Sequence, residues 1–447
     1  MKEMFRSLGL FNFRIWFIGA LVSNIGGWMQ STAQDWVVLT QLTDNDATAM
    51  GVTMALQFGP PLVLVSLTGW VADRFDRRKV LFLTQGALMA LAIVVGYLLL
   101  SGVMTLPLML FFALLFGIAN AFDSPARQAF VTDVVSRENA SNAVALNAAS
   151  FNTARLIGPA VGGVLIVVVG TGWVFMINAA TFLAMIIALA MMHTDELLPR
   201  VRATGRQRLA DGFRYVWGRP DLKVTFVIVF LVGAFGMNFP IFASTMALEF
   251  GKDADGYGLL SSVLAIGSLA GALLAARRDR ARMRVIMVAA GGFGLASLVS
   301  SFMPTYASYA VLLTFVGFFT VTMLTTANGY VQTTTEPALR GRVMALYMAV
   351  IMGSTPIGAP IAGWVAEAMG PRAAIQLGGV AGLLACTIGL LWLLASGRVH
   401  RDAGRRFGVT IDETQSIAVI PTPPEEFSDA VASTTPIRLP RSRPHSR

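Results

Sequence analysis

Apolar residues run along this chain in long continuous blocks, separated by short polar segments. The blocks have about 20 residues or more, the length an α-helix needs to cross a hydrocarbon core of about 30 Å. Because they are continuous rather than alternating, they predict helices and not the strands of a barrel. Twelve membrane-spanning helices are predicted, at about residues 13–40, 48–72, 79–101, 105–131, 141–169, 172–192, 222–248, 255–276, 284–302, 306–331, 341–368 and 372–396.

Basic residues gather in every second loop between these blocks. Clusters follow the second, fourth, sixth, eighth and tenth predicted helices, whereas the opposite loops carry only Lys252 and Arg372. Because basic loops remain on the cytoplasmic side, we expect a multi-pass protein of the inner (plasma) membrane with both termini in the cytoplasm. The net charge of +9 therefore reflects topology, and the expected partner is the lipid bilayer and not nucleic acid.

The two halves of the apolar region resemble each other at an offset of 200 residues. Each half holds six predicted helices, an even number, so the two copies have the same orientation in the membrane. Parallel repeats of this kind are typical of transporters whose substrate site lies between the halves. The matching positions are Ala145, Leu146, Ala149, Ile157, Gly158 and Gly163 with Ala345, Leu346, Ala349, Ile357, Gly358 and Gly363.

The repeat and the loops divide the chain into four parts. We expect a six-helix bundle at 1–192, a cytoplasmic central loop at 193–221, a second six-helix bundle at 222–396 and a disordered basic tail at 397–447. The central loop contains an amphipathic helix, which either lies on the inner leaflet or packs on the bundle. Its apolar positions recur at helical spacing: Leu209, Phe213, Val216 and Trp217.

The sequence excludes several classes of function. Cys386 is the only cysteine and the three histidines are scattered, so neither a disulfide nor a metal site is expected. A nucleotide-binding G-x-x-x-x-G-K-[ST] pattern and a paired catalytic constellation are both missing from the sequence. We therefore expect no enzyme activity and no cofactor.

The segment GWVADRFDRRKVL, after the second predicted helix, resembles motif A of the major facilitator superfamily. The matching residues are Gly69, Asp73, Arg74, Arg77 and Arg78, and Asp76 stands where the family most often has glycine. The resemblance implies an all-α fold of 12 transmembrane helices, arranged as two six-helix bundles around a central cavity. It also implies a gate in which Asp73 and Arg77 pair with an acid at the inner end of the fourth helix, where Asp123 is the candidate. The alternative is that these charges are solvated and only set the topology.

The segment ARLIGPAVGG resembles motif C, which within the superfamily marks antiporters and exporters. Gly158, Gly162 and Gly163 would let another helix approach closely, and Pro159 would bend the fifth helix. A bent seam of this kind can seal one end of a cavity, although ordinary tight packing is the alternative. The preceding segment DSPARQAFVTDVVSRENASNAVALN resembles the branch that contains enterobactin-type siderophore exporters and macrolide or drug efflux pumps.

Two charges inside predicted helices are candidates for proton coupling. Asp35 lies on a polar stripe of the first helix, where burial disfavours its ionised form and a proton could be carried. Arg155 shares the face of motif C, and its counterpart in the other half is the uncharged Thr355. The alternatives are that Asp35 lies at the outer rim and that Arg155 is a structural anchor. The arginine that many drug antiporters carry inside the fourth helix is not found in FFALLFGIANAF, and Arg127 is expected at the cytoplasmic end.

Apolar, aromatic and amide side chains are expected to line a central cavity suited to varied substrates. We therefore expect a secondary active, monomeric efflux transporter that exports amphipathic drug-like small molecules by proton antiport. A dedicated siderophore exporter is the close alternative, and a non-transporting sensor or scaffold is a further one. The candidate cavity residues are Asn24, Trp28, Gln30, Ser31, Gln34, Gln57, Asn147, Asn178, Phe235, Asn238 and Tyr347.

Overall fold

A computed structural model describes residues 6–196, 209–278, 280–396, 399–401 and 409–411. The chain divides into two units, Met1–Ala395 and Ser396–Arg447. The first unit holds the predicted bundles and is almost entirely helical. The second contains the residues predicted as a tail.

The first repeat follows the predicted helices closely, with one exception. The second predicted span is divided at Leu64, shortly after Pro60 and Pro61, whose missing N–H donors leave the carbonyls of Leu56 and Gln57 without helical bonds and bend the helix. The elements are η1 (Arg6–Gly9), α1 (Phe11–Thr40), α2 (Ala47–Val63), α3 (Val65–Arg74), α4 (Arg77–Leu100), α5 (Leu106–Asp133), α6 (Ala140–Val169) and α7 (Thr171–Ala190).

The second repeat also contains a broken span, which is its first. This span consists of α9 and α10, which are joined by a π-helical turn. A proline in the first turn of α10 marks where the second part begins. The elements are η2 (Thr194–Glu196), α8 (Leu209–Gly218), α9 (Pro220–Leu231), η3 (Val232–Gly236), α10 (Phe239–Glu249), α11 (Ala254–Ala276), α12 (Met283–Ser301), α13 (Tyr306–Thr334), α14 (Arg340–Met369) and α15 (Pro371–Ala395).

Twelve spans result from these helices, as the apolar blocks predict. In the described part of the chain, ten helical segments are long and apolar enough to cross a membrane, the pair α9–α10 counting as one. The long helix α1 and the divided pair α2–α3 complete the set. The prediction of two six-helix bundles is confirmed.

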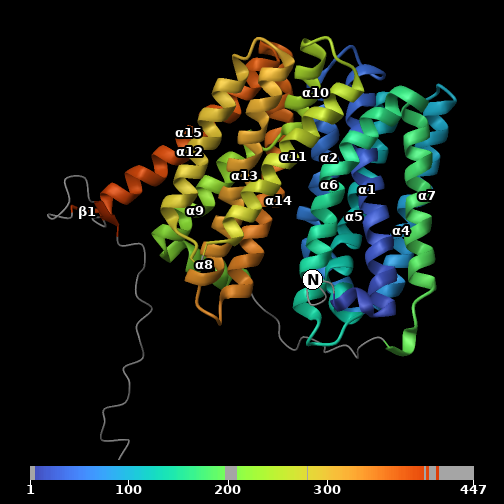
Figure 1. The fold of residues 1–447 in the computed structure, drawn as a ribbon, viewed down its shortest axis with the longest axis horizontal. Helices are drawn as coiled ribbons and strands as arrows, with labels where there is room; N and C mark the ends of the chain where they lie inside the picture. Colours follow the sequence, from blue (N-terminus) through green and yellow to red (C-terminus); the bar gives the residue numbers. More distant parts are fainter. Residues whose placement is uncertain (1–5, 197–208, 279, 397–398, 402–408, 412–447) are drawn as a thin grey trace, which may run out of the picture. The chain divides into compact units, whose positions relative to one another are not determined.

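Each repeat packs mainly within itself (Figure 1). In the first, α1 packs on α6 and α7, and α4 packs on α5 and α7; in the second, α11 and α12 pack on α13, and α15 packs on α12. The two repeats meet through a small number of helices: α2 lies along α14, α6 lies along α11, and α10 touches α1 and α2. Any site shared by the halves must therefore lie along these contacts.

The predicted amphipathic helix corresponds to α8, which packs against α14 and α9. Asp211 forms an ion pair with Arg342 of α14 at 3.2 Å, while Phe213 and Trp217 stack on each other and are exposed. Packing on the bundle is therefore seen, and an additional contact with the leaflet stays a prediction.

The unit Ser396–Arg447 contains two short strands, β1 (Val399–Arg401) and β2 (Val409–Ile411), which pair antiparallel. The prediction of a disordered tail did not include this pair, because three-residue strands leave little hydrophobic pattern in a sequence. The other residues of the predicted tail lie outside the described part of the chain.

Candidate functional site

The helices of unit Met1–Ala395 have two kinds of end. At one end, which we call the basic end, α3 meets α4 and α11 meets α12 through loops rich in arginine. At the other, the far end, α1 meets α2 and α10 meets α11. In Figure 1 the N-terminus is marked, and it lies toward the basic end of the helices.

Motif C forms a close contact between three helices. Gly158 and Gly162 lie against α1, and a Cβ added at Gly158 would come within 2.5 Å of the Trp28 Cβ. Gly163 faces α11 of the other repeat, where a Cβ would lie 2.5 Å from the carbonyl oxygen of Ala254. These glycines are therefore needed for α6 to touch both its own repeat and the opposite one.

The α6–α11 contact continues for two turns toward the basic end. Pro159 lies inside α6, and its carbonyl oxygen is 2.5 Å from where a Cβ of Gly258 would stand. The hydroxyl of Ser262 then donates a hydrogen bond of 3.0 Å to the carbonyl of Leu156. Together these contacts form a seam from Gly163 to Leu156, which we call the α6–α11 seam.

The repeat produces a matching contact, the α2–α14 seam. Gly363 faces the carbonyl of Ala47, and Gly51 faces the carbonyl of Ala359, so that no side chain fits at either glycine without movement. Both seams lie in the far-end half of their helices. They close the far end between the two repeats.

Asp35 lies at the same closed interface. It is only 3% exposed and stands five residues before the end of α1, about 8 Å from the far end of the helix. The hydroxyl of Tyr257 on α11 donates a hydrogen bond of 2.9 Å to its carboxylate. A second bond between the repeats runs from the backbone N–H of Ala47 to the Glu367 carboxylate at 3.1 Å.

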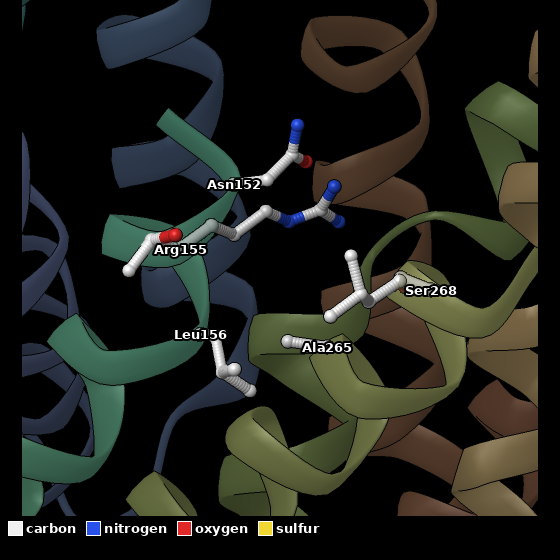
Figure 2. A pocket seen from close by; sticks show the side chains of 7 residues that line it. Asn152, Arg155, Leu156, Ala265 and Ser268 are labelled. Atoms are coloured by element: carbon white, nitrogen blue, oxygen red, sulfur yellow. The ribbon is translucent and has the colours of Figure 1, made fainter. Parts of the chain in front are cut away.

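A small pocket begins where the α6–α11 seam ends (Figure 2). Its volume of about 50 Å³ gives room for about three waters. Arg155 points into it from the middle of α6, and its guanidinium carbon lies 5.8 Å from the centre of the Trp28 ring. The lining residues are Asn152, Thr153, Arg155, Leu156, Ala265, Ser268 and Leu269.

Arg155 forms neither a hydrogen bond nor an ion pair with any residue that the structure describes, so its contact with Trp28 is the interaction that holds it. Asp35 stands near the far end of α1 and does not reach it. Asp35 and Arg155, the two candidates for proton coupling, therefore do not form an ion pair with each other.

Several predicted cavity residues bond to one another instead of facing this pocket. The Asn178 amide donates to Gln30 at 2.6 Å, and both side chains are buried between α1 and α7. The Gln34 amide donates to Gln57 at 3.0 Å and joins α1 to α2. Amides inside a helical bundle pair with each other in this way, although the Gln34 carbonyl oxygen is buried without a partner among the described residues.

Two further candidates are buried within the second repeat. Asn238 donates to the carbonyl of Ala234 at 2.6 Å, and Tyr347 donates to that of Leu324 at 3.1 Å. We therefore correct their role from cavity lining to structural support. The remaining candidates are half-buried and stay predictions: Asn24, Trp28, Ser31, Asn147 and Phe235.

The acid that meets motif A differs from the predicted one. Arg77 pairs with both carboxylate oxygens of Asp133, at 2.8 and 2.9 Å, and not with Asp123. The predicted position of Asp123 at the inner end of the helix was wrong, because α5 runs on to Asp133, which places Asp123 about 15 Å farther along the helix axis. The Asp73 side chain lies outside the described part of the structure.

The other motif A residues have local roles. Asp76 is the N-cap of α4 and accepts hydrogen bonds from the backbone N–H groups that follow, which explains an aspartate at this position. Arg78 donates to the carbonyl of Leu189 at 2.9 Å, and Arg74 lies over the ring of Trp70. No atom lies near where a Cβ of Gly69 would stand.

Asp123 instead belongs to a buried network that sequence reasoning missed. It accepts from the Thr84 hydroxyl and the Gln85 amide of α4, each at 2.7 Å, and from Arg127 one turn along α5 at 2.9 Å. Arg127 therefore lies inside the helix and not at its end. The i, i+4 spacing of Asp123 and Arg127 is the signal that could have predicted this pair.

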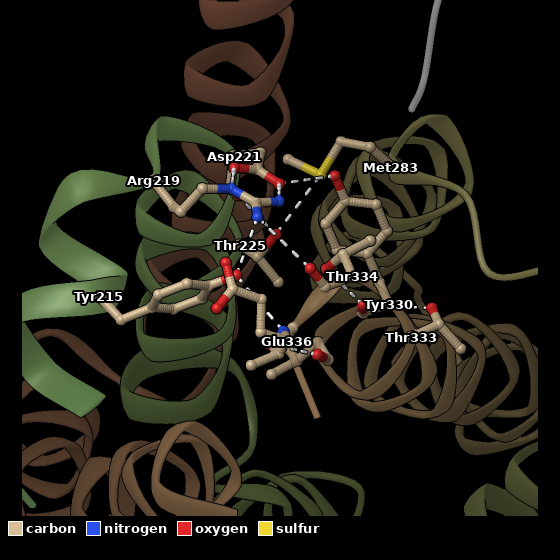
Figure 3. Close-up of polar contacts among 11 residues, drawn as sticks. Tyr215, Arg219, Asp221, Thr225, Met283, Tyr330, Thr333, Thr334 and Glu336 are labelled. Carbon is tan, nitrogen blue, oxygen red and sulfur yellow. Dashed lines mark hydrogen bonds and ion pairs between the residues drawn. The ribbon is translucent and has the colours of Figure 1, made fainter. Parts of the chain in front are cut away.

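A second polar cluster lies at the basic end of the second repeat (Figure 3). Arg219 forms two bonds to Asp221, at 2.7 and 2.9 Å, and a third to the Tyr215 hydroxyl at 3.1 Å. The Tyr330 hydroxyl of α13 donates to Asp221 at 3.1 Å. The hydrogen bond to Asp221 raises the pKa of Arg219 above its usual range, so this cation stays charged.

Comparisons with known proteins agree with this geometry. Residues 5–407 match the family described as transmembrane secretion effector. The multidrug efflux pump Tap of Mycolicibacterium fortuitum is 27% identical over 79% of this chain and 89% of its own. The staphyloferrin A transporter of Staphylococcus aureus is 22% identical over 80% of this chain and 90% of its own. The enterobactin exporter EntS of Citrobacter koseri is 25% identical over 81% of this chain and 87% of its own.

Solved structures share the fold at low sequence identity. A bacterial homolog of the human lysosomal transporter Spinster is 14% identical, with a TM-score of 0.63 over 85% of this chain and 95% of that one. A POT family transporter is 13% identical, with a TM-score of 0.68 over 86% of this chain and 96% of that one. The chain therefore belongs to the transmembrane secretion effector family of the major facilitator superfamily, and it is a membrane efflux transporter and not an enzyme.

Proposed function

We propose that this protein is a secondary active exporter of amphipathic small molecules in the inner membrane, driven by proton antiport. The basic end is the cytoplasmic end, because arginine-rich loops remain inside. The observation that carries the proposal is the position of the contacts between the repeats. Both seams close the far end, whereas the Arg155 pocket begins on the cytoplasmic side of the α6–α11 seam. This arrangement supports an inward-facing conformation ready to take substrate from the cytoplasm.

Export then requires the two repeats to rock about the substrate. The seams at the far end separate, and the cytoplasmic ends approach each other. The glycines let the helices pack closely through van der Waals contacts, which can separate when the seam opens. The motif A charges, with Arg77 held by Asp133 in this state, remain the proposed cytoplasmic gate.

Asp35 is the proposed proton carrier. Its hydrogen bond from Tyr257 joins the two repeats and has to break when the far end opens. The carboxylate is then exposed to the external solution, where it can take up a proton. Proton binding and the opening of the far end are thereby coupled at one residue.

A dedicated siderophore exporter is the second candidate. The relatives named for staphyloferrin A and enterobactin favour it, as does a cation without an anionic partner in the pocket.

Inside-out membrane vesicles test the proposed function. Their lumen corresponds to the external side, so an acidic lumen is expected to drive accumulation of a fluorescent amphipathic probe such as carboxyfluorescein. Asp35→Asn keeps an acceptor for Tyr257 and removes the proton carrier, so accumulation is expected to fall at least about tenfold while expression is unchanged. Glu367→Gln, at the same interface, is the matched control and retains accumulation.

The two parts of the proposal fail separately. Accumulation that survives collapse of the proton gradient, or that is normal in Asp35→Asn, contradicts proton coupling. Vesicles that accumulate none of a panel of anionic, neutral and cationic probes contradict export of amphipathic molecules.

A further inference from the structure

We propose that the Arg155 pocket is an anion subsite, which takes an oxyanion, such as a carboxylate, carried by an amphipathic substrate. The inference rests on the proposed export function and names its substrate class. It changes the expectation from drug-like molecules in general to those with a negative charge.

The first argument is the missing partner of Arg155. A charged side chain in a membrane span is costly, and such groups normally pair with an acid or with carbonyls. Asp123 and Arg127 satisfy this rule within the same repeat. Arg155 has no such partner among the residues that the structure describes, and the pocket it enters has no acidic lining residue. The substrate is therefore the group available to neutralise it.

The second argument is the position of the pocket between the repeats. Asn152 and Arg155 come from α6, whereas Ala265 and Ser268 come from α11 (Figure 2). An anion bound here contacts both repeats at the point where their seam ends. Binding would therefore draw α6 and α11 together toward the cytoplasmic side, which is the movement that export requires.

The third argument is the chemistry of the lining. A guanidinium presents a planar fork of donors that matches a carboxylate. Asn152 adds an amide, which uses one N–H on the carbonyl of Ala148 and keeps a second, whereas the Ser268 hydroxyl already donates to the carbonyl of Leu264. Trp28 holds the guanidinium, and Phe151 meets the Trp28 ring at 5.9 Å, so an apolar body can lie beside the anion. A cationic group would be repelled by Arg155 at the same place.

The repeat supplies an internal comparison. In the other repeat, Gly353 matches Thr153 of the pocket, and the side chain of Leu62 occupies the space beside it. The position equivalent to Arg155 is the uncharged Thr355. The α2–α14 seam therefore has an apolar contact where the α6–α11 seam has the charged pocket. This difference indicates a role in binding and not in the architecture that both repeats share.

Binding to the purified full-length protein tests the inference without requiring transport. The probes are dansylglycine, which is anionic, and its methyl ester, which is neutral and otherwise the same. Wild type is expected to bind dansylglycine at least about tenfold more tightly than the ester, from one charge-assisted contact. Arg155→Gln removes that preference and leaves ester binding unchanged, and Arg155→Lys retains part of it.

Arg137→Gln is the matched control, because it removes an exposed cation from the loop before α6 and should preserve the preference. Equal binding of both probes by wild type, or an unchanged preference in Arg155→Gln, overturns the inference. A variant that loses ester binding as well as anion binding indicates a structural role for Arg155 and also overturns it. An Arg155-dependent preference without proton-driven accumulation in vesicles would sustain the anion subsite and contradict only the proposed proton antiport.

Discussion

At the scale of single residues, the buried charges of this transporter differ in the partners that surround them. Asp123 has three donors, including Arg127, and is fixed in place. Asp35 has one neutral donor from the opposite repeat. Among the residues that the structure describes, Arg155 contacts the face of the Trp28 ring and has no charged partner. The number of partners therefore separates a structural charge from a charge free to bind a proton or a substrate.

The Arg219–Asp221 pair gives a prediction about stability. Its side chains are 22% and 6% exposed, and it connects α9 to α8 and α13. Arg219→Gln leaves the Asp221 carboxylate buried without its cation, so the protein should lose about 3 kcal/mol of stability. Thermal unfolding in detergent measures the change. Arg340→Gln, at an exposed position, is the control, and equal unfolding temperatures for the two variants would contradict the role of the pair.

Which residues pair could be predicted only in part. The motif A resemblance indicated that Arg77 pairs with an acid of α5, but which acid depends on where α5 ends, and the partner is Asp133, ten residues beyond the predicted Asp123. A hydropathy pattern defines the apolar centre of a helix well and its polar end poorly. That Arg155 has no charged partner among the described residues could not be predicted, because this depends on which side chains of neighbouring helices lie beside it.

At the scale of elements, glycines decide how closely the two repeats approach. Gly158 and Gly163 in α6 could be identified from the sequence, because G-P-x-x-G-G is a small-residue pattern. Their partners, among them Gly258 in α11 and Gly51 in α2, could not, since each is a single glycine in an apolar block. Pro60 and Pro61 could have predicted the division of the second span near Leu64, but the apolar block is continuous there and predicts one helix.

Gly163→Val tests the α6–α11 seam. Its Cβ would collide with the carbonyl of Ala254, which is backbone and cannot turn aside. The far end should then fail to close, with transport reduced at least about tenfold and with greater access of external thiol reagents to a cysteine at position 257. Gly86→Val in α4 is the control, because no atom lies within 4 Å of its Cβ position. Normal transport in Gly163→Val would mean that the seam has no part in gating.

At the scale of the whole molecule, the transporter combines two matching seams between its repeats with candidate site residues that occur in one repeat only. The fold, the twelve spans and the parallel repeat could be predicted from apolar blocks and the offset of 200 residues, because both are long-range patterns that local errors do not disturb. The two seams follow from that repeat. Asp35 and Arg155 break it, since each occurs in only one copy, and they hold the proposed proton and substrate functions.

The central claim is that export requires the far end to open between the repeats. It is tested most directly by locking that end between Ala47→Cys and Glu367→Cys, at two residues that bond across the interface, in a Cys386→Ser background. The reagent is a short bis-methanethiosulfonate, which joins the two cysteines through disulfide bonds that a thiol can reduce. Proton-driven accumulation in inside-out vesicles is expected to stop on crosslinking and to return on reduction, while each single cysteine variant is unaffected. Full accumulation by the crosslinked protein would contradict it.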